Sequence, residues 1–148
     1  MKYRLFALFG LLLFASATAH AQNNSLSFPD VSGRTGQELV IPLQGSFTDD
    51  INGIVMTVLY NPNVVGIADV SLAEGASDFS LETNLAAGQL RVAMAGANSI
   101  TGDGAILNLT VRLVGPPGAA TVLDIALAVL NEGDLTASRS NGLVTVIR

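Results

Sequence analysis

Apolar residues recur at every second position in one short segment after another, and Gly, Asn, Asp and Pro interrupt these segments at short intervals. Successive side chains of a strand point to opposite faces, so a period of two predicts an all-β domain. Nine short strands are expected, which favours a sandwich of two antiparallel sheets. The predicted strands are Ser25–Phe28, Glu38–Leu43, Ile54–Tyr60, Val64–Ala68, Asp78–Thr83, Gln89–Ala95, Ile106–Val114, Thr121–Leu130 and Leu143–Ile147.

Residues that suit tight turns lie between the predicted strands, because they tolerate a positive φ or hold φ fixed. The predicted turns are Ser32-Gly33, Asn52-Gly53, Asn61-Pro62, Ala87-Gly88, Gly102-Asp103-Gly104, Gly115-Pro116-Pro117-Gly118 and Asn141-Gly142. No internal repeat, low-complexity linker or run of charge separates them. The pattern therefore predicts one domain.

The same alternation predicts which side chains form the core. Each strand has one face of large aliphatic residues, and each such residue contributes about 1.5 to 3 kcal/mol when it is fully buried. The expected core residues are Leu39, Ile41, Leu43, Ile54, Met56, Val58, Tyr60, Leu90, Val92, Met94, Leu107, Leu109, Val111, Leu113, Leu123, Ile125, Leu127 and Val129. A polar substitution such as Val92→Asp is expected to unfold the domain.

The opposite faces differ from strand to strand. Asn108, Thr110 and Arg112 form an ordinary solvated face. The outward residues of three other strands are small and mostly uncharged, and together they would form a flat surface of the kind that often marks a partner site. Scattered alanine and valine on an exposed sheet is the plainer alternative. The predicted partner-binding residues are Gly53, Val55, Thr57, Leu59, Arg91, Ala93, Ala95, Asp124, Ala126 and Ala128, with Val122 beside them.

The first 21 residues have the features of an export signal. Lys2 and Arg4 give a positive start, Leu5–Ala17 is mostly apolar, and Ala19-His20-Ala21 offers the small-x-small pattern for cleavage after Ala21. A membrane anchor is the alternative, but a spanning helix needs about 20 apolar residues. We therefore expect a signal peptide at 1–21, a mature domain at 22–148, and a location outside the cytoplasm, either extracellular or periplasmic.

Composition removes most kinds of catalytic centre. After residue 21 the chain has no histidine, cysteine, lysine or tryptophan, so the usual general base, activated nucleophile and zinc ligands are missing. All 12 acidic residues lie in this part, opposed only by arginines, and an acidic surface repels nucleic acid and anionic lipid. We therefore expect that the protein is not an enzyme, has no cofactor and does not bind nucleic acid.

Three stretches of sequence have the motifs of a known family. Residues 36–43 read GQELVIPL, residues 51–67 read INGIVMTVLYNPNVVGI, and residues 102–114 read GDGAILNLTVRLV. The chain resembles a cohesin domain, which carries G-x-x-V-x-I-P-V-like, Y-D-P-x-V-L and G-D-G-x-(I/L)-x-x-(I/L)-x-(F/V)-x-(V/L) motifs in this order. Gly88-Gln89-Leu90 resembles the G-x-L element of the family. The chain has Asn61 where the family more often has Asp.

The resemblance implies a nine-stranded jelly-roll sandwich that docks a protein. Cohesins bind dockerins, which are small calcium-loaded helical domains carried by polysaccharide-degrading enzymes. In the family the docking surface is the sheet face of the third, fifth, sixth and eighth strands, where the small outward residues were placed above. Gly53 and Val55 stand where well-studied cohesins of one type carry polar residues. The implied partner face is therefore more hydrophobic here.

Direct carbohydrate binding is the alternative function, since several carbohydrate-binding modules share a related sandwich. Sugars stack on exposed aromatic rings. After residue 21 the aromatic residues are Phe28, Phe47, Tyr60 and Phe79. Tyr60 and Phe79 fall on predicted core faces, which leaves Phe28 and Phe47 as candidate exposed rings.

Two further kinds of site depend on acidic residues. A glycoside hydrolase needs two positioned carboxylates, and Asp49 with Asp50, or Asp103 with Asp134, are the candidate pairs. Three turns are also rich in the oxygen ligands that calcium prefers: Thr48-Asp49-Asp50, Gly102-Asp103-Gly104 and Asn131-Glu132-Gly133-Asp134. None has a recognised ligand spacing, and short polar side chains are common in surface turns. No metal ligand is therefore predicted.

Overall fold

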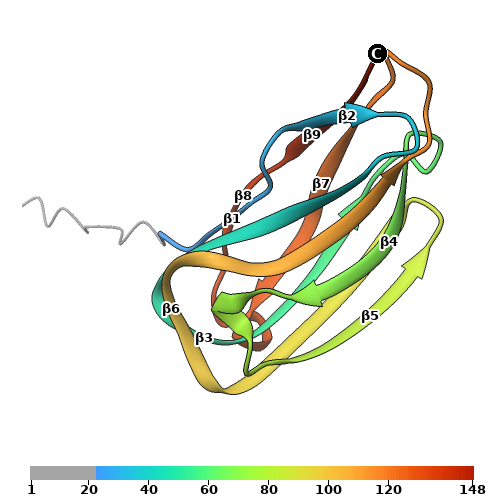
Figure 1. Cartoon of the computed structure of the whole chain (residues 1–148). Helices are drawn as coiled ribbons and strands as arrows, with labels where there is room; N and C mark the ends of the chain where they lie inside the picture. The colour runs from blue at the N-terminus through green and yellow to red at the C-terminus, as the bar shows by residue number, and fades with distance from the viewer. Residues whose placement is uncertain (1–22) are drawn as a thin grey trace, which may run out of the picture.

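The computed structural model describes residues 23–148, which form nine strands and two short 3-10 turns. The predicted signal peptide lies outside the described residues. The strands are β1 (Ser25–Ser27), β2 (Val31–Arg34), β3 (Glu38–Leu59), β4 (Val65–Leu72), β5 (Ser80–Ala86), β6 (Gln89–Leu113), β7 (Ala120–Leu130), β8 (Ser138–Ser140) and β9 (Gly142–Ile147). The turns are η1 (Glu74–Ala76) and η2 (Asn131–Gly133). The predicted all-β sandwich is confirmed (Figure 1).

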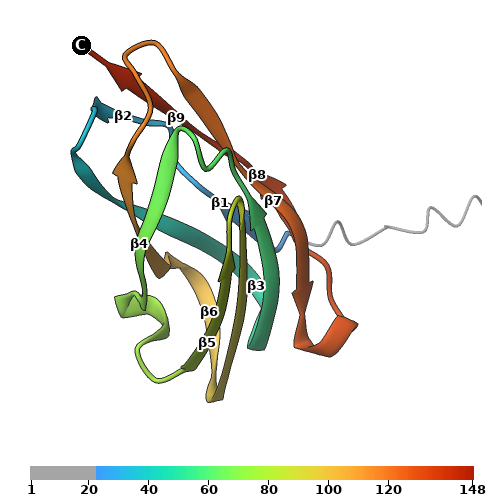
Figure 2. The same cartoon turned by 90° about the vertical axis from the view of Figure 1, so that its right-hand side faces the viewer.

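The strands β3 and β6 pass from one layer of the sandwich into the other. The first part of β3 pairs with the last part of β6, and the last part of β3 pairs with the first part of β6. One layer therefore has the order β5–β6–β3–β7, and the other has the order β4–β6–β3–β1–β8. Figure 2 shows these layers from the side, with β4 and β7 on opposite sides of the molecule.

Two predicted turns lie inside these long strands. Asn52-Gly53 falls within β3, and Gly102-Asp103-Gly104 falls within β6. Here the pairing shifts register, at Phe47/Ile51 and Ile51/Gly53 of β3, so each strand bends without ending. Strands commonly change sheets through bulges and bends of this kind. The prediction of turns that end a strand at Asn52-Gly53 and at Gly102-Asp103-Gly104 was wrong, because β3 and β6 bend near these residues and continue.

Two short strands make the sheet mixed. β2 pairs with β9 in parallel, and β8 pairs with β1 in parallel. The predicted turn at Ser32-Gly33 lies within β2. Neither strand was predicted, because VSGR and SRS are too short and too polar to show alternation. The expectation of purely antiparallel sheets was therefore wrong at these two edges.

The core lies between the two layers and follows the alternation closely. Most predicted core residues are buried, including Ile41, Met56, Val92, Leu109 and Ile125, and Leu39 and Tyr60 pack against them while partly exposed. Two predictions were wrong, both on β7. Leu127 is 47% exposed, and Val129 does not belong to the buried core. The pairing of β7 with β3, described below, explains why these two residues face outward.

Candidate functional site

The outer face of the β5–β6–β3–β7 layer is the candidate site, and we call it the plateau. Pairing places its outward residues in four rows across the strands. The rows are Ser80–Ala95–Gly53, Glu82–Ala93–Val55–Val129, Asn84–Arg91–Thr57–Leu127 and Ala86–Gln89–Leu59–Asp124. The structure thus brings together the predicted residues on the third and sixth predicted strands, and Asp124 with them.

The plateau carries exposed apolar residues on β3, β6 and β7. Val55 is 48% exposed, Leu59 is 40% exposed and Leu127 is 47% exposed, although each is a large hydrophobic residue. Ala93 and Ala95 beside Val55 are also exposed and add no polar group. A contiguous exposed apolar patch on a sheet is a common mark of an interaction surface.

A β-bulge decides which residues of β7 reach the plateau. Thr57 lies opposite Leu127, whereas the next residue of β3, Val58, lies opposite Ile125. One extra residue, Ala126, is thereby inserted into β7, and beyond it the inward and outward positions exchange. Leu127 consequently lies on the plateau. Val122, before the bulge, is exposed as predicted.

Ala128 was predicted on the partner face, and the bulge makes that placement wrong. It lies opposite buried Met56 and packs against the core. Val129, which follows it, lies opposite Val55 and lines the plateau. Ala126 is exposed at the bulge itself. An uninterrupted period of two predicts Leu127 and Val129 inside and Ala128 outside, which is the opposite of the arrangement beyond the bulge.

Side chains from the segment after η2 stabilise the bulge. Nη1 of Arg139 donates hydrogen bonds to the carbonyl oxygens of Ile125, at 2.9 Å, and Ala126, at 2.7 Å. Oδ1 of Asn141 accepts the backbone N–H of Ile125 at 3.0 Å, and its Nδ2 donates to Asp124 at 3.1 Å. A bulge leaves backbone groups without a partner in the ladder, so these bonds satisfy them.

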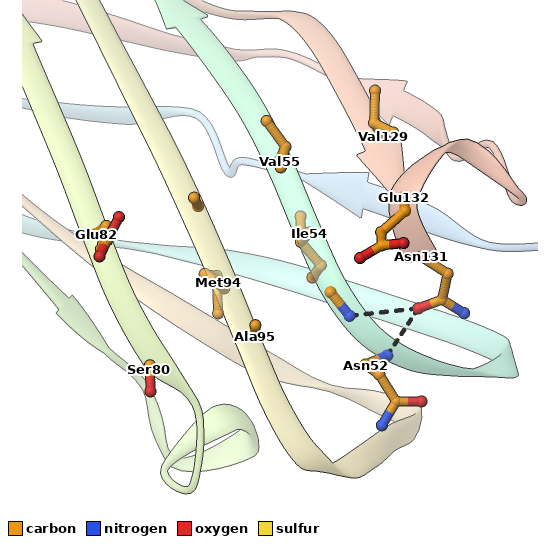
Figure 3. Close-up of a pocket in the computed structure, with 12 residues that line it drawn as sticks. Asn52, Ile54, Val55, Ser80, Glu82, Met94, Ala95, Val129, Asn131 and Glu132 are labelled. Carbon is orange, nitrogen blue, oxygen red and sulfur yellow. Dashed lines mark hydrogen bonds between the residues drawn. The ribbon is translucent and has the colours of Figure 1, made fainter.

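A hollow of about 560 Å³ lies at one end of the plateau (Figure 3). Its floor is formed by Gly53, Val55, Ala93, Ala95 and Val129, with Ile54 and Met94 beneath them. Its rim includes Glu82 on β5 and Glu132 in η2, which Figure 3 shows on opposite sides. The floor is therefore apolar, and the rim is acidic.

Asn131 positions the rim. Its Oδ1 accepts the backbone N–H groups of Asn52, at 2.8 Å, and Gly53, at 3.3 Å, and its Nδ2 donates to the carbonyl oxygen of Asp50 at 2.8 Å. These bonds join η2 to the bend of β3, as the dashed lines in Figure 3 partly show. The sequence alone indicates Asn131 and Glu132 only as part of a candidate calcium turn.

Three of the other candidate acidic residues, Asp49, Asp50 and Asp103, lie inside β3 and β6, and their carboxylates accept hydrogen bonds there. Oδ2 of Asp49 accepts a hydrogen bond from Nδ2 of Asn24 at 2.8 Å, and Oδ1 of Asp50 accepts one from Thr101 at 3.2 Å. Asp103 accepts one from Ser46. Within residues 23–148, no three acidic or histidine side chains gather as a metal site. These acids therefore stabilise the bends of β3 and β6.

The candidate sugar-stacking rings are buried. Phe28 is 4% exposed, Phe47 is 3% exposed and Phe79 is 6% exposed, so the prediction of exposed rings at Phe28 and Phe47 was wrong. Tyr60 packs against the core, and its hydroxyl donates to the carbonyl oxygen of Ala86 at 3.4 Å. Across residues 23–148 no aromatic ring is left as an exposed stacking platform. This disfavours carbohydrate binding by stacking.

Comparison with known proteins identifies the fold. No protein-family model matches the chain, and no curated protein matches it. Solved structures do match. A non-cellulosomal cohesin from the archaeon Archaeoglobus fulgidus superimposes with a TM-score of 0.76 at 18% identity, covering 85% of this chain and 92% of that one.

Two bacterial structures give a similar result. The sixth cohesin of scaffoldin B from Acetivibrio cellulolyticus, solved in complex with the Cel5 dockerin, has a TM-score of 0.72 at 20% identity and covers 84% of this chain and 99% of that one. CaCohA2 from Clostridium acetobutylicum has a TM-score of 0.68 at 18% identity and covers 85% and 92%. The chain therefore has the cohesin fold. Separately, the described residues include no helix long and apolar enough to cross a bilayer.

Proposed function

We propose that the chain is a secreted, non-catalytic protein-binding module whose plateau docks a calcium-loaded dockerin-type domain. The module would contribute to the assembly of an extracellular polysaccharide-degrading complex or a cell-surface complex. The observation that carries this proposal is the set of large hydrophobic residues exposed on the plateau, Val55, Leu59 and Leu127. The fold supports it, because several similar structures are cohesins in complex with dockerins.

The plateau has the physical character that protein docking needs. Val55, Ala93, Val129 and Leu127 form an uncharged region across β6, β3 and β7. Arg91 borders this region on the inner strand β6, and Glu82 and Asp124 border it on β5 and β7, so apolar contact area lies beside charged groups, as in many protein interfaces. Hydrogen bonds that Arg139 donates to β7 and that Asn131 accepts from β3 hold β7 and η2 in place, so the surface is ordered before a partner binds. A preorganised surface lowers the ordering cost of binding.

The test is capture of purified dockerin domains by residues 22–148, immobilised through a terminal tag. A panel of dockerins would be applied with calcium and again with a chelator of calcium. We expect at least one dockerin to bind only when calcium is present, and its binding to be lost in Val55→Asp. A panel that shows no binding would overturn the proposal. Retention of the module on insoluble cellulose, chitin or xylan would favour direct carbohydrate binding instead.

Export is a separate part of the proposal, and it rests on the signal-like residues 1–21. Expression of the full chain in a bacterium with a functional secretory pathway would test it. We expect the protein outside the cytoplasm to begin at Gln22, as mass spectrometry of the intact chain would show. Accumulation of uncleaved chain in the cytoplasm would contradict this part and leave the docking proposal unaffected.

A further inference from the structure

Strand β5 is an edge strand, and Figure 1 shows it at the margin of its layer. Within residues 23–148, β5 pairs with β6 alone, so its backbone N–H and C=O groups that face away from β6 have no strand partner. A row of such groups can pair with a strand of another chain. The pairing of β5 with β6 runs over seven residues without a register shift. β5 is therefore regular enough to be extended by a further strand.

The other edges in the part of the chain that the structure describes are protected against such pairing. β4 has a register shift between Ile67 and Asp69, and Asp69 is exposed there. β2 and β8 are only four and three residues long. Bulges, charged residues and short strands are the usual protection of a sheet edge. β5 has no bulge, proline or lysine, and its one charged residue is Glu82.

Leu85 lies on the inward side of β5 but is not covered. It is opposite Leu90 of β6, which is 1% exposed, whereas Leu85 itself is 52% exposed. In the described chain β4 pairs with β6 and not with β5, so the sandwich is open on this side. Leu81, on the same side of β5, packs against the core and is also partly exposed. Burial of these leucines by a neighbouring strand would be favourable.

The sequence of β5, SLETNLA, is nearly symmetric about Thr83 in the kinds of side chain that it carries. In an antiparallel pair of two β5 strands centred on Thr83, Leu81 of each copy lies opposite Leu85 of the other. Glu82 then lies opposite Asn84. A pair centred on Glu82 would instead place two carboxylates opposite each other, and a pair centred on Asn84 would place neither leucine opposite a leucine. A two-fold interface needs such self-complementarity, whereas pairing with an unrelated strand does not.

We propose that β5 pairs with β5 of a second copy of this chain, in an antiparallel two-fold dimer with Thr83 at the axis. Residues directly opposite each other in an antiparallel pair point to the same face, so the plateaus of the two copies lie on the same side of the dimer. The inference goes beyond the proposed function and does not depend on it. If both hold, the dimer presents two docking surfaces side by side, which would strengthen the capture of a partner with two binding modules.

Analytical ultracentrifugation of residues 22–148, which include the whole described fold, tests the inference. Reversible pairing makes the weight-average mass depend on protein concentration. We expect this mass to rise from that of a monomer towards that of a dimer as the concentration is raised to about 0.5 mM.

Charges introduced at Thr83 test the register. Thr83 is exposed, so a charged side chain there stays hydrated in the monomer. Thr83→Lys alone, or Thr83→Glu alone, would place two like charges at the two-fold axis, and we expect each to weaken association by at least about tenfold. An equal mixture of the two variants would place a lysine opposite a glutamate. We expect the mixture to associate at least as strongly as the wild type, to within about threefold.

The matched control is the same pair of charges at Ser71, which is exposed on the edge strand β4. Ser71→Lys and Ser71→Glu should each associate as the wild type does. If the wild type stays monomeric over the whole concentration range, or if Thr83→Lys associates as strongly as Ser71→Lys, the inference is wrong. A mixture of the two Thr83 variants that stays monomeric would also overturn it. None of these results would affect the docking proposal, since the plateau is complete in one copy.

Discussion

The guanidinium of Arg139 donates a hydrogen bond to the carbonyl oxygen of Ile125 at 2.9 Å, across the chain segment that joins β7 to β8. A second bond from the same nitrogen reaches Ala126. These bonds stabilise the bulge that turns Leu127 outward. The exposure of Leu127 on the plateau therefore depends on a side chain that lies outside the plateau.

Arg139→Ala is expected to lower the free energy of unfolding by about 1 to 3 kcal/mol, because both carbonyl groups lose a charged donor. Urea denaturation would measure this loss. Arg112→Ala is the matched control, since Arg112 forms only a half-exposed salt bridge with Glu38 and its removal should cost less than about 1 kcal/mol. Equal losses for the two variants would show that Arg139 does not stabilise the bulge.

The alternation of the sequence predicted the core well wherever a strand pairs without interruption. Met56, Val92 and Leu109 are buried because the period of two holds through their segments. It failed on β7, where Ala126 is the extra residue. Nothing in the run ATVLDIALAVL marks that position, because the residues that stabilise the bulge, Arg139 and Asn141, lie in another segment.

The candidate site was predicted only in part for a related reason. The residues Gly53, Val55, Ala93 and Ala95 were placed correctly, since they depend on alternation alone. Glu132 was missed as part of the plateau. Its position depends on the positive φ angles of η2 and on the bonds from Asn131 to β3, which are tertiary interactions.

Val55→Asp is expected to abolish partner capture while the melting temperature changes by only a few degrees. Val55 is 48% exposed, so a carboxylate there stays hydrated in the free protein but would be buried without a partner in a complex. Capture assays and thermal denaturation would be run side by side. Ala93→Asp, directly opposite on β6, is expected to behave in the same way.

Val40→Asp is the matched control for these two variants. Val40 is 63% exposed and lies on β3 in the other layer, opposite Thr110. It should bind normally and unfold at nearly the wild-type temperature. If Val55→Asp and Ala93→Asp also bind normally, the plateau is not the docking surface.

Val92→Asp is expected to unfold the protein. Val92 lies on β6 beside Ala93 but points inward, and it is 1% exposed. A buried unpaired carboxylate costs several kcal/mol, which is comparable to the whole stability of a typical domain, about 5 to 15 kcal/mol. Far-ultraviolet circular dichroism would show loss of the β signal. A folded Val92→Asp protein beside an unfolded Ala93→Asp protein would mean that the two faces of β6 are assigned in reverse.

Asn131→Ala is expected to lower the free energy of unfolding by about 1 to 3 kcal/mol, since two backbone N–H groups lose their acceptor and Asp50 loses a donor. Asn131→Gly separates this effect from backbone preference, because glycine adopts a φ of 48° without strain. Urea denaturation of both variants would separate the contribution of the lost side-chain hydrogen bonds from that of the backbone conformation. We expect Asn131→Ala to be the less stable of the two.

Glu132→Gly is expected to stabilise the protein, because Glu132 has a positive φ. At a φ of 60° glycine avoids the steric cost that glutamate pays, so Glu132→Gly should unfold at a higher urea concentration than Glu132→Ala, by about 1 kcal/mol in free energy. Equal stability of Glu132→Gly and Glu132→Ala would show that the backbone of η2 is unstrained at this residue.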